Sequence, residues 1–323
     1  MSVTSTPGSR PRVDLEYTYS QVRIRRMQHS MRFLPRAPVP LERGQLQILE
    51  RAAFRRRIDT KTAELDPAGR VSLSFTDDAY ESIEYALEGV VSDRQKSLYQ
   101  NHARLEALAM AQVREAVTLD QELDVSDLLF SRARFPIGDG TGLDVATPWN
   151  QDNSTPISDI DDAVEQLADT TGVEPEDMQF AMHRRVLKDL NLNAQVTSRF
   201  SGGATELAKG QLMANHLKEQ WGIGDVWTFS GTYETGPKGA EVQNQIWPQA
   251  MGMLYVPLAA IGEEVPDTMP PCLGASYYPQ DQPVAVTQYR SNNPAADMFL
   301  VSELLSFKLT ETPVGLLVGN LRA

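Results

Sequence analysis

Few side chains in this sequence have the types and spacing that catalysis or metal binding requires. The four histidines, His29, His102, His183 and His216, lie far apart, and none has a second ligand at helical spacing. Histidine metal sites normally gather two or three ligands, so these residues predict no metal ion. Phosphate-loop, nucleophile-elbow and zinc-protease motifs are also missing from the sequence. We therefore expect no catalytic residue, no cofactor and no metal.

A cysteine and an acidic cluster are the remaining candidates for chemistry. Cys272 is the single cysteine and follows two prolines. A thiol nucleophile needs an activating neighbour, so we interpret Cys272 as a small buried residue in a reducing compartment. Asp159, Asp161 and Asp162 form the densest carboxylate cluster. A cation site is one interpretation; acids in the first turn of a helix, which complement its dipole, are the favoured one.

The charge of the chain is unevenly distributed. The net charge is −13, yet residues 1–70 hold 14 Lys and Arg against 7 Asp and Glu, and the remainder holds 16 against 36. Such asymmetry predicts that the basic part meets something acidic, either nucleic acid or the body of another copy. The residues that we expect to contact a neighbouring subunit are Arg23, Arg25, Arg26, Arg32, Arg55, Arg56, Arg57 and Lys61.

The basic part divides into two segments. Residues 1–40 contain five prolines, which interrupt helices and sheets, and are predicted to form an extended arm. Residues 41–80 are predicted to form a projecting hairpin or loop. Within it, 45–57 favours a short helix, 66–69 a turn, and the alternation in 71–75 a strand. The polar start of the chain has no apolar stretch typical of a signal peptide.

The clearest helix lies in the second hundred residues. No Gly or Pro occurs between Gly89 and Pro136, and apolar residues recur at helical spacing. A helix over 102–123 would be about 33 Å long. Its packing residues are predicted to be Leu105, Leu108, Leu119 and Leu123.

The rest of the chain mixes helices with separated strands. A helix is predicted to open after Ser158, with Ser158 and Asp161 as a capping box, and to end at Thr171 and Gly172. Further helices are predicted at 183–190 and 205–221. Strands are predicted at 178–182, 225–230, 251–256, 284–289 and 298–310. Without βαβ periodicity, this order predicts an α+β fold, and no apolar run reaches the length of a membrane span.

One segment resembles a known family. Residues 149–172, WNQDNSTPISDIDDAVEQLADTTG, resemble the tailed-bacteriophage major capsid proteins, in which a Trp loop precedes a helix that ends in Thr-Gly. Further pieces follow in the same order: Gly222 to Val226, Ile246 to Pro248 and Leu254 to Pro257. Upstream, Tyr85 to Glu88 and Val91 to Arg94 resemble the segment before the family's spine helix, although Ser92 replaces a usual acid.

The resemblance implies a fold, a function and partners. It implies an N-terminal arm (1–40), a projecting loop (41–80), a peripheral domain with the spine helix and a long sheet (81–145 and 276–312), and an axial domain (146–275 and 313–323). It also implies self-assembly into the hexamers and pentamers of an icosahedral head that encloses double-stranded DNA. Portal, scaffolding and decoration proteins are the implied partners, with assembly in the host cytoplasm and no membrane.

Two alternatives stay open at this point. One is an encapsulin-like shell of a cellular compartment, and the other is a soluble hydrolase with a site in the loop 136–158. Some capsids of the family also join a loop lysine to a neighbour's asparagine. Lys61 is the first lysine of this chain, and an amine, unlike a guanidinium, can lose its proton and attack a carbonyl. A solvated loop lysine is the favoured interpretation.

Overall fold

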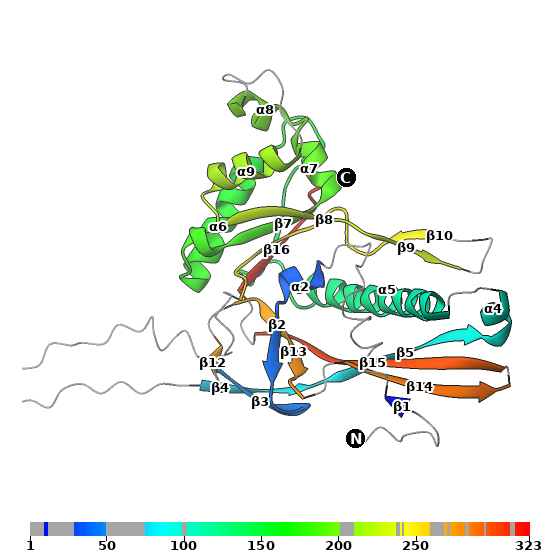
Figure 1. Ribbon diagram of the computed structural model, residues 1–323. Helices are drawn as coiled ribbons and strands as arrows, with labels where there is room; N and C mark the ends of the chain where they lie inside the picture. The colour runs from blue at the N-terminus through cyan, green and yellow to red at the C-terminus, as the bar shows by residue number, and fades with distance from the viewer. Residues whose placement is uncertain are drawn as a thin grey trace, which may run out of the picture.

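The chain forms two regions around two separate sheets (Figure 1). The long-sheet region contains a six-stranded sheet covered by one long helix, and the five-strand region contains a second sheet covered by several helices. The computed structural model describes residues 10–11, 29–49, 75–98, 102–200, 210–236, 240, 242–258, 268–269, 272–281, 284–293, 295–310 and 314–323.

The long sheet is organised around strand β15 (Ala295–Leu309). Strands β14 (Val284–Asn292) and β5 (Ile83–Ser92) pair antiparallel along it, and β13 (Gly274–Pro279) pairs with its C-terminal end. Strand β2 (Arg36–Val39) runs parallel to β13, and the two-residue strand β1 (Arg10–Pro11) pairs with β14. Three segments far apart in the sequence therefore meet in one sheet.

Helix α5 (His102–Leu129) lies across one face of this sheet, after the short helix α4 (Asp93–Leu98). Its 28 residues make it about 42 Å long. Met110, Val113 and Val117 pack against Phe299 and Val301 of β15. The predicted helix is confirmed, and it extends six residues beyond its predicted end.

The predicted packing face of α5 is partly wrong. Leu105, Leu119 and Leu123 lie partly buried against the core, but Leu108 is 58% exposed. Leu108 stands two positions before Met110, which is about 200° around the helix, so it points away from the sheet. The helix is therefore rotated relative to the face that its leucines alone suggested.

The five-strand sheet has the order β6 (Gly142–Asp144), β16 (Gly315–Gly319), β11 (Gly252–Tyr255), β7 (Gln179–His183) and β8 (Asp225–Phe229). Its helices are α6 (Pro156–Thr171), α7 (Arg184–Leu190), α8 (Ala194–Phe200) and α9 (Gly210–Trp221), with a 3-10 turn at Pro175–Asp177. Phe180, Leu254 and Leu316 belong to the core on the helix side. Ala181, Met253 and Leu317 belong to the core on the other side, so both faces are buried.

The second of these cores joins the two regions. It contains Val125 and Leu129 from α5, and Phe33 from the short helix α2 (Ser30–Phe33). The Phe33 ring lies 4.7 Å from the Trp227 ring and 5.3 Å from that of Tyr255. The prediction of an extended arm is therefore wrong for 30–39. The stretch 30–39 contains enough apolar residues to form a helix and a strand, and the groups that pack against them come from elsewhere in the chain.

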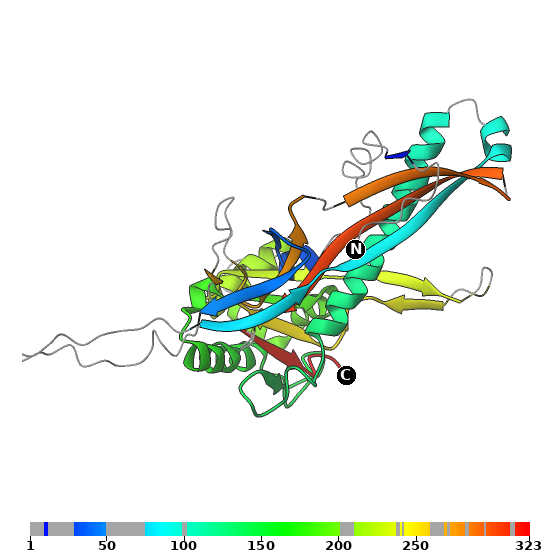
Figure 2. The ribbon, with the colours of Figure 1, turned by 90° about the horizontal axis from the view of Figure 1, so that it is seen from below.

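Two further pairs of strands lie at opposite sides of the body (Figures 1 and 2). In the first, β3 (Arg43–Leu49) pairs antiparallel with β4 (Phe75–Glu81), and β12 (Thr268–Met269) runs parallel to β3. In the second, β9 (Thr232–Thr235) pairs with β10 (Val242–Gln245). The ends of the predicted loop 41–80 pair as strands, and its assignment as a projecting loop stays a prediction. The predicted helix at 45–57 is wrong for 45–49, which gain a partner strand, and its remainder lies outside the described residues with the turn at 66–69.

Most other predicted elements are confirmed, as is the α+β class. Helix α6 ends at Gly172, whose φ is 67°, but it begins at Pro156. Ser158 therefore lies inside the helix, and the predicted capping box is wrong because Pro156 starts the helix earlier. Residues 205–209 of the predicted helix before Trp221 lie outside the described residues. No helix in the described part of the chain is long and apolar enough to cross a membrane.

Candidate assembly surfaces

The face of the long sheet opposite α5 is partly apolar, and no described helix covers it. Side chains alternate along β15, so Phe299 and Val301 are buried under α5, whereas Met298, Leu300 and Leu304 point to the other face and stay half-buried. Val90 of β5, opposite Met298, is 47% exposed. In the described parts of the chain no helix packs on this surface. We call Val90, Met298, Leu300 and Leu304 the open face.

The edge of β5 is a second surface on which another chain can dock. Within the described ranges β5 pairs only with β15, so one row of its backbone groups has no partner strand. Ile83 and Leu87 on this strand are 60% and 40% exposed. An exposed edge with apolar side chains is a template for pairing with another strand.

Ion pairs hold the far end of the long sheet in shape. Arg290 of β14 contacts Asp93 of α4 at 2.5 Å and Asp297 of β15 at 2.9 Å, and Lys96 of α4 also pairs with Asp297. Arg290 lowers the pKa of Asp93. Partial burial alone would raise the pKa of Asp297, but Lys96 and Arg290 hold it below its ordinary value. This network fixes α4 against the sheet.

Buried polar contacts fix α2 and β2 to the long-sheet region. The backbone N–H and the hydroxyl of Ser30 donate to Oε1 of Glu122 on α5, at 2.8 and 2.6 Å. Burial raises the pKa of Glu122, and these hydrogen bonds oppose the shift. Arg36 pairs with Glu303 of β15 at 2.5 Å, and Gln121 donates to the same carboxylate at 3.0 Å. Residues 30–39 are thus bound to the body by charge as well as by packing.

The predicted contact residues have different outcomes. Arg32 pairs with Asp225 of its own chain at 2.5 Å, and its guanidinium lies 4.4 Å from the centre of the Trp227 ring. Its contact with a neighbouring subunit stays a prediction. The others, namely Arg23, Arg25, Arg26, Arg55, Arg56, Arg57 and Lys61, lie outside the described residues.

Hydrogen bonds within the segment around Trp149 hold the start of helix α6 in place. The indole N–H of Trp149 donates to Asp159 at 2.8 Å, and Asn193 donates to Ser154 at 2.6 Å. Burial raises the pKa of Asp159, and the hydrogen bonds from Trp149 and Thr155 oppose this. Of the three acids predicted for the first turn of α6, Asp159 lies there, whereas Asp161 and Asp162 lie beyond it because the helix begins at Pro156. These contacts fix where α6 begins.

The remaining candidates for chemistry are mostly packing residues. Cys272 is fully buried, as predicted. His29 stacks on Trp227, and its Nε2 lies 3.1 Å from the carbonyl oxygen of Ser230; burial lowers its pKa. Among the described residues, no group of three or more His, Cys, Asp or Glu side chains gathers around a common point.

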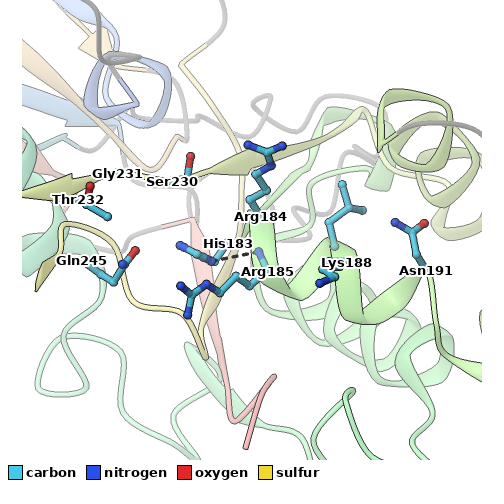
Figure 3. A pocket seen from close by; sticks show the side chains of 10 residues that line it. His183, Arg184, Arg185, Lys188, Asn191, Ser230, Gly231, Thr232 and Gln245 are labelled. Atoms are coloured by element: carbon cyan, nitrogen blue, oxygen red, sulfur yellow. Dashed lines mark hydrogen bonds between the residues drawn. The ribbon is translucent and has the colours of Figure 1, made fainter. Parts of the chain in front are cut away.

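One basic pocket was not expected from the sequence (Figure 3). It is a cavity of about 550 Å³ beside α7, and His183, Arg184, Arg185 and Lys188 line it. The signal was available, because these residues stand together in a chain of net charge −13. From the sequence, His183 was considered only as a possible metal ligand, and the cluster of basic residues after it was overlooked.

Comparison with solved structures identifies the fold. A phage-related protein from Bordetella bronchiseptica RB50 is 19% identical, with a TM-score of 0.69 over 96% of this chain and 97% of that one. The capsid structure of cyanophage P-SCSP1u aligns with a TM-score of 0.54 and 11% identity over 90% and 87%. A virus-like particle from Pyrococcus furiosus gives 0.51 and 11% over 95% and 96%.

No family model and no curated protein matches the sequence. The similarity to these proteins is therefore seen in the structure. The chain has the fold of tailed-phage capsid proteins, and the predicted resemblance is confirmed at this level. Two of these structures belong to shells, namely the cyanophage capsid and the virus-like particle.

Proposed function

We propose that this chain is a major capsid protein, which assembles into hexamers and pentamers of an icosahedral phage head enclosing double-stranded DNA. The observation that carries the proposal is the alignment of nearly the whole chain with a phage-related protein, at a TM-score of 0.69. The proposal includes no enzymatic activity.

The surfaces of the monomer support assembly. The open face is an apolar area on an otherwise charged protein, and such areas mark sites where another protein binds. The acidic part of one copy and the basic residues 1–70 of another have complementary charge. We propose that a neighbouring copy covers the open face.

The domain assignment belongs to the same proposal. Residues 81–145 with 276–312 would form the peripheral domain and 146–275 with 313–323 the axial domain. The body contacts of α2 and β2 move the end of the arm from residue 40 to a position before Ser30. Portal, scaffolding and decoration proteins are the further partners, the packaged DNA lies against the inner face, and the mature protein resides in the virion after assembly in the host cytoplasm.

Electron microscopy of the purified full chain tests the proposal. We expect closed particles of uniform size. Particles that carry nuclease-protected DNA when they are isolated from phage-producing cells support a phage head. Particles that carry a specific protein cargo support the encapsulin-like alternative instead, and a monomer at every concentration contradicts both.

A pair of variants tests the open face. Leu300→Lys places a charge at its centre, and because Leu300 is only half-buried we expect a folded monomer that no longer forms particles. Leu192→Lys is the matched control, since Leu192 is exposed on the turn between α7 and α8. Equal yields of particles from Leu300→Lys and Leu192→Lys would show that no copy packs on the open face.

Two further experiments address the residues 1–70. Changing Arg55, Arg56 and Arg57 to Glu is expected to weaken assembly and to make it more sensitive to salt.

A covalent link through Lys61 would produce a ladder of bands on a denaturing gel of mature particles, which Lys61→Arg abolishes. A single band at 35.9 kDa excludes the link.

A further inference from the structure

The pocket beside α7 has an unusual charge for this protein. Ten residues line it, and three of them are the cations Arg184, Arg185 and Lys188. None of the ten is Asp or Glu, although the chain carries 43 acidic residues. Within the described part of the chain, none of the three cations forms an ion pair. A concentration of positive charge without internal neutralisation attracts anions.

A buried hydrogen-bond donor lies among the cations. His183 is 3% exposed, and its Nδ1 accepts a hydrogen bond from the backbone N–H of Arg185 at 3.1 Å. Burial, assisted by Arg185 and Arg322, lowers the pKa of His183 to about 4, so the ring is neutral near pH 7. A neutral imidazole whose Nδ1 accepts must carry its proton on Nε2.

The Nε2–H group of His183 has an incomplete environment. It has no acceptor at normal hydrogen-bond geometry among the described residues, although the Gln245 side chain faces the ring closely enough to oppose part of the fall in its pKa. A buried donor without an acceptor is costly in free energy. An acceptor bound in the pocket would relieve that cost.

The lining groups suit an anion with several oxygens. Figure 3 shows Arg184 and Arg185 extending in different directions from the start of α7, with Lys188 and Asn191 farther along the helix. Thr232 and Gln245 add neutral donors from β9 and β10. Arg185 and Lys188 together carry two positive charges, which match a doubly charged anion better than the single charge of a carboxylate. A phosphate group carries about −1.5 to −2 charges near pH 7 and three strong acceptor oxygens.

We propose that the pocket formed by His183, Arg185, Lys188 and the β9–β10 hairpin is a binding site for a phosphate group. The group approaches the guanidinium of Arg185 and the ammonium of Lys188, and an oxygen accepts the Nε2–H of His183. The source of the phosphate is either a free phosphate or the backbone of a nucleic acid. The pocket is distinct from the open face and the β5 edge.

Equilibrium dialysis of the full chain with radioactive inorganic phosphate tests the proposal in whatever state of assembly the protein adopts. We expect saturable binding of one phosphate per chain. Arg185→Gln combined with Lys188→Gln should bind at least about tenfold more weakly, because each lost charge-assisted hydrogen bond contributes about that factor or more. Both side chains are exposed, so the variant should fold, which circular dichroism checks.

The matched control is Arg94→Gln combined with Arg104→Gln, which removes the same charge from exposed positions outside the pocket. Its phosphate binding should equal that of the wild type. Absence of saturable binding to the wild type at millimolar phosphate, or equal weakening in the control, overturns the proposal.

A short single-stranded oligonucleotide without a terminal phosphate distinguishes the two sources. Competition with phosphate that is lost in the Arg185, Lys188 variant supports backbone phosphate as the ligand. Phosphate binding without such competition supports a free phosphate.

Discussion

The two sheets of this protein differ in how many of their faces are covered. The five-strand sheet is buried on both sides, and its strand β16 is buried at every position. The long sheet is covered by α5 on one side, and β15 alternates between buried and half-buried positions. A sheet with two buried faces has no apolar face left for a partner, whereas a sheet with one apolar open face offers a surface for one. The proposed function would therefore assign stability and assembly to different parts of the molecule.

The largest expected effect comes from a charge placed under α5. Met110 is fully buried against the long sheet, so Met110→Asp should lower the free energy of unfolding by more than about 4 kcal/mol, since the charge has no partner there. Leu108→Asp, two positions away on the same helix, should change it by about 0.5 kcal/mol or less. Urea denaturation measures both. A similar loss in both variants would mean that the two faces of α5 do not differ.

The next largest effect compares the two sheets directly. Phe180 is fully buried beneath the helices of the five-strand sheet, and Phe180→Ala should cost about 3–5 kcal/mol. Leu300→Ala on the open face should cost about 1 kcal/mol in the free chain, because Leu300 is already half-exposed. Thermal unfolding of unassembled protein provides the measurement. A loss of stability in Leu300→Ala that matches Phe180→Ala would show that the open face is covered within the chain.

A smaller effect depends on pH and arises in the five-strand region. His183 has a folded pKa of about 4, below its ordinary value of 6.5. Below pH 6.5 the unfolded chain takes up a proton that the folded chain does not, so stability is full above pH 6.5 and falls towards pH 4. Burial also lowers the pKa of His29, so His29 contributes to the loss of stability at low pH in the same way. The pKa of Glu122 is raised, which has the opposite effect on stability.

The contribution of His183 is isolated by His183→Gln. Unfolding midpoints in urea at pH 7 and pH 5 should differ less in this variant than in the wild type. An identical difference in the two proteins would show that folding does not lower the pKa of His183.

The smallest expected effect lies at the far end of the long sheet. Arg290→Gln removes the ion pairs with Asp93 and Asp297, but Arg290 and Asp93 are half-exposed. Pairs in water contribute little to stability, and salt screens them further. We expect a slight shift of the unfolding midpoint at low salt that disappears at high salt. A large shift that salt does not reduce would place these pairs in the core of the fold.

Local patterns in the sequence were sufficient for much of the fold. The interval without Gly or Pro predicts α5, Gly172 predicts the end of α6, and the alternation in 298–310 predicts β15. These features depend on backbone preferences and on the repeat of a single element, which neighbouring residues determine. The order of motifs from Trp149 onwards was also sufficient to predict the capsid fold.

Contacts between distant segments decided the rest. The leucines alone predict one packing face for α5. The face that is buried also includes the polar residues Gln121 and Glu122, because Glu303 and Ser30 supply hydrogen-bond partners for them. Residues 30–39 join the core because β13 and α5 lie beside them, and 45–49 become a strand because β4 pairs with it. The phosphate pocket needs β9 and β10 beside α7. A sequence specifies each side chain, but only the tertiary structure determines which distant groups pack against it or form hydrogen bonds with it.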